Sequence, residues 1–257
     1  MLFLHNHHNP SSHHYSSLAE PPLKQFLPCK LSSLHNFFKN PFLHGFNWKM
    51  AMAAGNNNPI VFDPSTSMYL VSCDGLTIET TITDKSGIVD KWIQVVSSTY
   101  AGKQRIVGLD TEWTTAKKPK MKVAILQLCI ENKCLIIQLF HMDNIPQSLR
   151  SFLMDSNFEF VGVGVINDLR MLKNDYGLEC NKGIDVSLLA KEKWPHRISS
   201  GALKYLAKEL VGLEMEKSKA VCTSEWQSKE LTQTQIEYAC IDAYASFKIG
   251  KMILNQD

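Results

Sequence analysis

Residues 106–113 read Ile-Val-Gly-Leu-Asp-Thr-Glu-Trp, so an apolar run ends in two carboxylates separated by one residue. The run predicts a buried strand. Because side chains alternate faces along a strand, Asp110 and Glu112 would project together from its end. Like charges that close favour a cation between them, and Mg²⁺ or Mn²⁺ suits oxygen ligands. Because Asp-x-Glu is a short and common pattern, a strand whose polar end faces solvent is the simpler interpretation of this stretch alone, and the rest of the chain must decide between the two.

The charge of the chain is unevenly distributed. All 257 residues together carry a net charge of +2, but residues 1–58 hold four lysines and one glutamate, which leaves residues 59–257 at −1. The body is therefore not a strongly basic nucleic-acid binder, and any contact with a polyanion would depend on metals and local lysines. No apolar run approaches the ~18–20 residues of a membrane span, so no membrane partner is expected.

Residues 1–58 differ in composition from the rest of the chain. They contain seven of the nine histidines and several serine pairs, without hydrophobic periodicity. This composition predicts a disordered or targeting segment. Few acidic residues and many serines suit an organelle transit peptide, whereas the lack of arginine counts against one. We expect the protein in the nucleus or cytoplasm, or in an organelle if this segment is a transit peptide.

Residues 66–254 combine strand and helix patterns and are expected to form one domain. Strands are expected where β-branched and apolar residues cluster, at 68–73, 76–83, 106–113, 123–130, 134–140 and 158–165. Helices are expected where apolar residues recur at helical spacing, at 84–99, 145–153, 167–177, 186–193, 201–211 and 232–254. This order of elements predicts an α/β fold with a mixed central sheet flanked by helices.

Helix boundaries are marked by polar residues. Asp84 is expected to cap the helix at 84–99, and Thr232 with Gln235 matches a capping box at the start of the last helix. Trp226 is expected to pack the loop before that helix. Gly177 is expected to end the helix that starts near Asn167.

Three further residues could carry chemistry. Asp168 stands where the strand at 158–165 passes into a helix, and sites in α/β sheets form at the carboxyl ends of strands. A helix N-cap is the simpler role for Asp168. Tyr238 and Asp242 are spaced i, i+4 and therefore share one face of the last helix. Taken alone, the two residues are more simply explained as a solvated or hydrogen-bonded pair.

Taken in order, these five residues and their surroundings resemble the Werner-syndrome-type 3′–5′ exonuclease domains of the DEDDy family, which has four acidic residues and a tyrosine. The matching stretches are 108–113, 122–129, 162–168 and 231–245. The resemblance covers residues 66–254 and implies a ribonuclease-H-like mixed sheet. A sister type has His five residues before the last Asp, where this chain has Glu237, so Tyr238 places it with the tyrosine type.

The resemblance implies metal-dependent hydrolysis at the 3′ ends of DNA or RNA. Two Mg²⁺ or Mn²⁺ ions about 4 Å apart can activate a water and hold the leaving oxygen. Asp110 would bridge both ions, and Asp168 would hold the second one. Glu112 and Asp242 would complete the site of the water-activating ion. Tyr238 would orient the attacking water, because a phenol with a pKa near 10 is a poor base at neutral pH.

Other functions remain open at this point. One is a catalytically weak module that keeps the fold and binds nucleic acid or a partner. Another is an endonuclease of the same general fold. Since the chain ends just after the last motif, we expect a stand-alone nuclease domain, with a helicase or repair partner acting in trans.

Two features beside the carboxylates have open roles. Trp113 alternates away from Glu112, which favours packing over a platform for base stacking. Lysines 117, 118, 120 and 122 could contact a phosphate backbone, or they could form an ordinary solvated loop.

Overall fold

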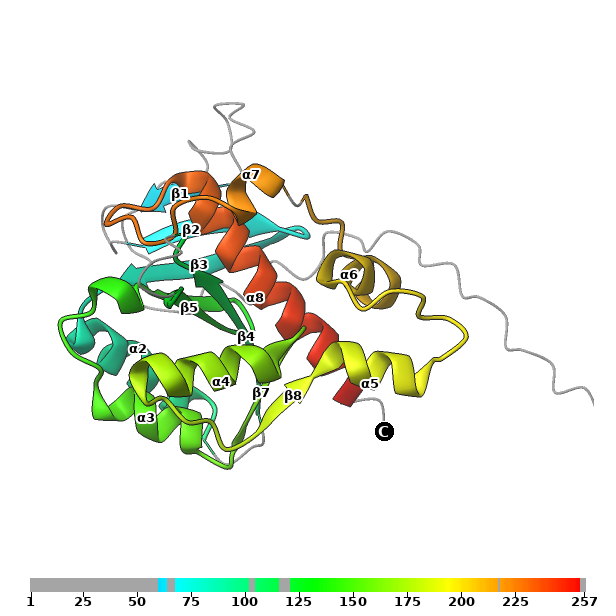
Figure 1. Cartoon of the computed structure of the whole chain (residues 1–257), viewed down its shortest axis with the longest axis horizontal. Helices are drawn as coiled ribbons and strands as arrows, with labels where there is room; N and C mark the ends of the chain where they lie inside the picture. The colour runs from blue at the N-terminus through cyan, green and yellow to red at the C-terminus, as the bar shows by residue number, and fades with distance from the viewer. Residues whose placement is uncertain (1–59, 64–67, 102–104, 116–120, 217, 255–257) are drawn as a thin grey trace, which may run out of the picture. The chain divides into compact units, whose positions relative to one another are not determined.

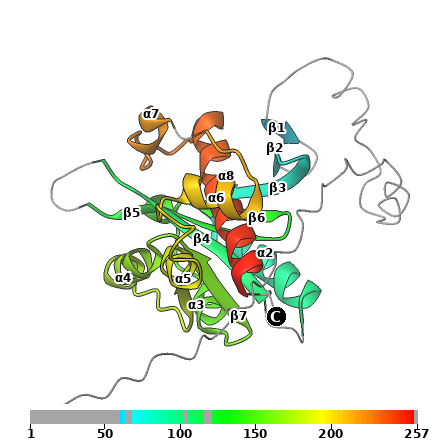
Figure 2. The ribbon, with the colours of Figure 1, turned by 90° about the vertical axis from the view of Figure 1, so that its right-hand side faces the viewer.

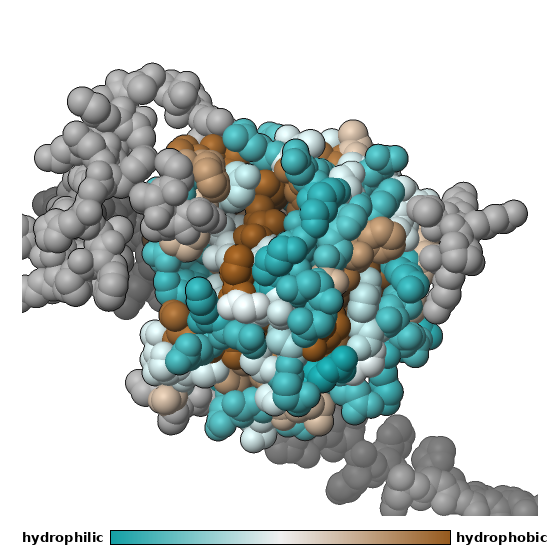
Figure 3. Space-filling view, turned by 90° about the vertical axis from the view of Figure 1, so that its left-hand side faces the viewer, coloured by the Kyte–Doolittle hydropathy of each residue, from teal (hydrophilic) through white to brown (hydrophobic). Residues whose placement is uncertain are grey.

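The computed structural model describes residues 60–63, 68–101, 105–115, 121–216 and 218–254. The expected disordered or targeting segment, residues 1–58, lies outside them, as do three of the loop lysines. None of the described helices is both long and apolar enough to cross a membrane. On the face shown in Figure 3, hydrophilic side chains surround a hydrophobic strip.

An eight-stranded mixed sheet forms the centre of the described domain (Figure 1). Its strands lie side by side in the order β1 (Ile60–Asp63), β2 (Met68–Cys73), β3 (Leu76–Thr83), β6 (Lys133–Ile137), β5 (Val123–Ile130), β4 (Arg105–Trp113), β7 (Phe158–Gly162) and β8 (Gly183–Asp185). Strand β4 pairs antiparallel with β5 and parallel with β7. The predicted α/β class with a mixed central sheet is confirmed.

Helices cover both faces of the sheet (Figures 1 and 2). One face packs against α5 (Val186–Lys193), α6 (Leu203–Val211) and α8 (Gln233–Leu254). The other packs against α2 (Ser86–Thr99), α3 (Gln147–Met154) and α4 (Val165–Tyr176). Each face has its own cluster of buried apolar side chains. The 3₁₀ turn η2 (Leu139–His141) and the short α7 (Lys219–Cys222) complete the described elements.

Most predicted boundaries agree with the structure, and the differences have local causes. The strand expected at 134–140 ends at Ile137, because the chain turns there into η2. The strand expected at 158–165 ends at Gly162, and α4 begins at Val165 after Gly164, which has the left-handed φ of 74°. The capping box is confirmed: the Thr232 backbone N–H donates to Gln235 Oε1, and the Gln235 N–H donates to Thr232 Oγ1. Gly177 ends α4 in the left-handed conformation, as predicted.

The expected role of Asp84 as a helix cap is wrong. Helix α2 begins after Lys85, whose side chain makes no capping hydrogen bond. The Asp84 carboxylate instead pairs with the ammonium groups of Lys229 and Lys85. An ion pair with a residue 145 positions away competes with the local cap and is invisible to a local sequence pattern.

Helix α8 lies in unusually close contact with β4. A Cβ atom on Gly108 would lie 2.0 Å from the Ala243 carbonyl oxygen and 2.6 Å from the Phe247 nitrogen. Only a residue without a side chain lets the backbones of β4 and α8 approach this far, and that approach brings the last helix to the carboxylates of the strand.

Gly108→Ala is therefore expected to destabilise the protein by more than the ~1–3 kcal/mol of ordinary overpacking, because the clash is with backbone atoms. Gly87→Ala in α2 is the matched control: a Cβ atom added there would meet no described atom within 4 Å, and alanine favours a helix by roughly 0.5–1 kcal/mol. Denaturant unfolding followed by circular dichroism measures both changes. Equal changes in the free energy of unfolding for the two substitutions would contradict the close approach of β4 and α8.

Candidate active site

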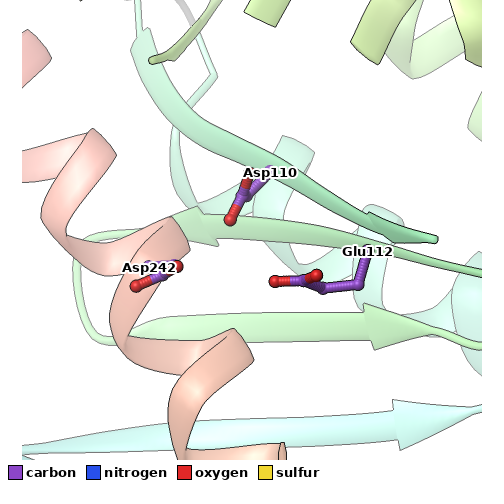
Figure 4. Close-up of side chains that lie close together, drawn as sticks. All are labelled: Asp110, Glu112 and Asp242. Atoms are coloured by element: carbon purple, nitrogen blue, oxygen red, sulfur yellow. The ribbon is translucent and has the colours of Figure 1, made fainter. Parts of the chain in front are cut away.

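Strand β4 and helix α8 bring three carboxylates together. Oxygen atoms of Asp110, Glu112 and Asp242 all lie within 4.8 Å of one another. Figure 4 shows the side chains of Asp110 and Glu112 from the strand and of Asp242 from the helix pointing toward one another. Glu112 and Asp242 are buried, with 8% and 2% of their surface exposed, and Asp110 is half-buried. The i, i+2 alternation that the sequence predicted for Asp110 and Glu112 thus directs both toward α8.

The residue between them, Thr111, points to the opposite face of the strand. Its hydroxyl donates a hydrogen bond of 2.7 Å to Asp168 Oδ1 on α4, and both residues are buried. Strand alternation therefore lets one tripeptide engage two helices, one on each face of the sheet. Asp168 is not the N-cap of α4, since Gly164 holds that place; it lies in the first turn, at the carboxyl end of β7.

Burial raises the pKa of Asp168 to about 6, while the hydrogen bond from Thr111 lowers it and the charge of Asp185 raises it further. In the metal-free protein this carboxyl group therefore binds a proton at mildly acidic pH. A cation held there would have to displace that proton, so metal binding should weaken as the pH falls through about 6.

Thr111→Val keeps the shape of the side chain but removes the hydroxyl. We expect metal-dependent activity to fall by about 10-fold or more, in the range found for residues that orient metal ligands. Thr111→Ser keeps the donor and should stay near the wild-type value. Titration of activity against Mn²⁺ concentration distinguishes the two variants. A serine variant as weak as the valine variant would show that packing, and not the hydrogen bond, matters.

Tyr238 lies one helical turn before Asp242 and is buried. Its ring packs on Trp226 at a centroid distance of 5.9 Å, and the Trp226 indole N–H donates to the Cys222 carbonyl oxygen at 3.2 Å. Burial, the negative charge of Asp242 and a hydrogen bond with the Cys222 thiol raise the pKa of Tyr238 far above its usual range. The phenol therefore stays protonated, and its hydroxyl can orient a water but cannot act as a base.

An open groove of about 930 Å³ runs over these residues. Asp110, Glu112 and Asp168 lie in it, so the fourth carboxylate faces the same space as two of the clustered three. Its walls also include apolar side chains, namely Trp113, Met121, Val163 and Met171. A groove lined by both acidic and apolar side chains can hold a phosphate through cations and a base or sugar through apolar contacts.

The donor set fits hard divalent cations. Every candidate ligand is a carboxylate oxygen, which Mg²⁺ and Mn²⁺ prefer over sulfur or imidazole sites. Three carboxylates in so small a volume repel one another unless they are protonated or share a cation. The chemistry of the site therefore agrees with the expected metal, and its four carboxylates could hold more than one ion.

The family model described as 3′–5′ exonuclease matches residues 81–256. The chain belongs to the 3′–5′ exonuclease family. The match covers β4, α4 and α8, the three elements that carry the carboxylates. The predicted resemblance to this family is thereby confirmed.

Individual relatives agree with this assignment. A 3′–5′ exonuclease of Arabidopsis thaliana is 35% identical over 151 residues, which cover 57% of this chain and 52% of that protein. The mouse bifunctional 3′–5′ exonuclease/ATP-dependent helicase WRN is 31% identical over 153 residues, 58% of this chain and 11% of that protein. The match therefore spans about half of the first relative and a small part of the second.

The structure of Escherichia coli RNase D, an exoribonuclease, superposes with a TM-score of 0.59 at 19% identity over 68% of this chain and 44% of that one. At this identity the likeness concerns the fold. It supports the predicted ribonuclease-H-like arrangement of the sheet.

Two features of the groove differ from the sequence analysis or were absent from it. Trp113, for which the sequence favoured packing, also lines the groove, at the point where the register of β4 and β5 shifts between Glu112 and Trp113. Cys222 and Thr223 also line it; they were missed because α7 has only four residues and no periodic pattern. Trp226 packs the loop before the last helix, as predicted. Lys122 does not line the groove, and the other loop lysines lie outside the described residues.

Proposed function

We propose that this protein is a metal-dependent 3′–5′ exonuclease that removes nucleotides from the 3′ ends of DNA or RNA. The observation that carries the proposal is the meeting of Asp110, Glu112 and Asp242 within 4.8 Å in a chain of the 3′–5′ exonuclease family. Asp168 supports it, since it faces the same groove and is held by a residue of the same strand segment.

Each residue has a role that its position supports. Asp110, Glu112, Asp168 and Asp242 would hold two Mg²⁺ or Mn²⁺ ions, which supply charge neutralisation and an activated water when bound. The protonated Tyr238 hydroxyl would hold the attacking water in line with the terminal phosphodiester. The apolar walls of the groove would contact the terminal nucleotide.

All five residues are present and none of the carboxylates is replaced, which does not favour a catalytically weak binding module. A helicase or repair partner acting in trans, and a location in the nucleus, the cytoplasm or an organelle, stay proposals. So do the limits of the nuclease domain at residues 66–254.

A digestion panel tests the proposal. The purified chain is incubated with recessed duplex, blunt duplex, single-stranded DNA, single-stranded RNA and circular single-stranded DNA, each with Mg²⁺, with Mn²⁺ or with a chelator. We expect shortening of at least one linear substrate, an intact circle, and no reaction with the chelator. A cut circle would identify an endonuclease, and binding without cleavage of any substrate would identify the binding module.

A further inference from the structure

Gln127, in the middle of β5, is a buried polar side chain whose amide finds no partner in the described part of the chain. It has no exposed surface, and neither its amide nitrogen nor its carbonyl oxygen makes a hydrogen bond to any described residue. Leaving such a group unsatisfied in the core destabilises the folded protein. A leucine or methionine would fill the same space without that cost. An amide at this position therefore indicates a hydrogen-bond partner.

The neighbours of Gln127 on the same face of the sheet indicate which group is that hydrogen-bond partner. Its cross-strand partners are Asp110 on β4 and Ile136 on β6, and Ile125 and Cys129 lie two positions away along β5. Directly paired residues place their Cβ atoms about 4.5–5.5 Å apart on one face. The two isoleucines are apolar, and the Cys129 thiol contacts a backbone carbonyl oxygen at 3.8 Å. Among these neighbours in the sheet, Asp110 is therefore the strong acceptor.

We infer that Gln127 is a positioning residue for Asp110: in the metal-loaded protein, its side-chain N–H donates a hydrogen bond to the Asp110 carboxylate. This bond would fix the orientation of the Asp110 carboxylate, which is only half-buried. It would also give the buried side-chain N–H of Gln127 a hydrogen-bond acceptor. The inference rests on the proposed metal site and adds a residue that the five-residue motif does not contain.

Metal binding measured without nucleic acid tests the inference. Gln127→Met removes the amide, keeps the length of the side chain and suits an apolar surrounding. The control is Leu128→Met, which introduces the same side chain at the next position, where it faces the core on the opposite side of the sheet. Free Mn²⁺ is counted by electron paramagnetic resonance during a titration of each protein.

We expect Gln127→Met to weaken Mn²⁺ binding by about 10-fold or more, which is the lower end of the effect of residues behind metal ligands. Its resistance to urea should equal or exceed that of the wild type. Leu128→Met should bind Mn²⁺ like the wild type. In an Asp110→Asn background, the substitution of Gln127 should cause no further loss, because the acceptor is already altered.

The outcomes separate this inference from the proposed function. If the wild type binds Mn²⁺ and Gln127→Met binds it within twofold of the same affinity, Gln127 does not position Asp110 and the inference is wrong. If the wild type binds no Mn²⁺ at all, the proposed metal site itself is wrong. Should Gln127→Met fail to fold, Gln127→Leu carries the same expectation.

Discussion

Asp242→Asn is expected to reduce the release of 3′-terminal nucleotides by about 1,000-fold or more. The substitution keeps the shape of a side chain that is 2% exposed but removes the negative charge that, under the proposed function, helps hold a cation beside Asp110 and Glu112. A bound divalent ion stabilises the transition state by several kcal/mol, and about 4 kcal/mol corresponds to a factor of roughly 1,000 in rate. Steady-state rates on an end-labelled oligonucleotide, in Mg²⁺ and in Mn²⁺, measure the effect.

Glu237→Gln is the matched control for this experiment. It makes the same change from carboxylate to amide on the same helix, at the position where the sister type of the family has its histidine. The pKa of Glu237 is raised by burial and by the charge of Glu216, so its electrostatic partner lies outside the carboxylate cluster. We expect nearly wild-type rates. If the Asp242→Asn variant is as active as this control, Asp242 is not part of the active site.

Asp110→Asn is expected to change stability in opposite directions with and without metal. In the metal-free protein, neutralising one of three carboxylates that lie within 4.8 Å relieves repulsion of about 1–4 kcal/mol at an effective dielectric constant near 20. The wild type should gain about 2.7 kcal/mol when Mn²⁺ reaches 100 times its dissociation constant, and the variant should gain little. The variant should thus melt at the higher temperature in chelator and at the lower temperature in Mn²⁺.

Thermal unfolding of both proteins under the two conditions measures this reversal. Such a trade between stability and function is expected where like charges are assembled for a ligand. A variant that is less stable than the wild type in chelator would show that Asp110 serves the fold and not a metal.

The sequence predicted much of the fold because the central strands are long and apolar. The boundaries of β2, β3 and β5 agree with the predicted ranges, as do those of α5. Strands β1 and β8 were missed because they have only four and three residues. In such short segments, pairing with the neighbouring strand decides the structure and periodicity gives no signal.

The site shows the same division between local and distant causes. Alternation along β4 was enough to predict that Asp110 and Glu112 share a face. The bond from Thr111 to Asp168 joins residues 57 positions apart, and it replaces the N-cap role that the local pattern suggested for Asp168. Likewise, the sequence places Gln127 inside the apolar strand at 123–130 but does not show which group its amide faces. Its meaning depends on the register that pairs it with Asp110.

The most direct test of the proposed function follows the length of a 5′-labelled single strand during digestion in Mn²⁺. We predict a ladder of labelled products that shorten one nucleotide at a time, with the label retained until the end of the reaction, because cleavage starts at the 3′ terminus. Immediate release of the label as a mononucleotide, or a few labelled fragments from internal cuts, would contradict the proposal that this protein is a 3′–5′ exonuclease.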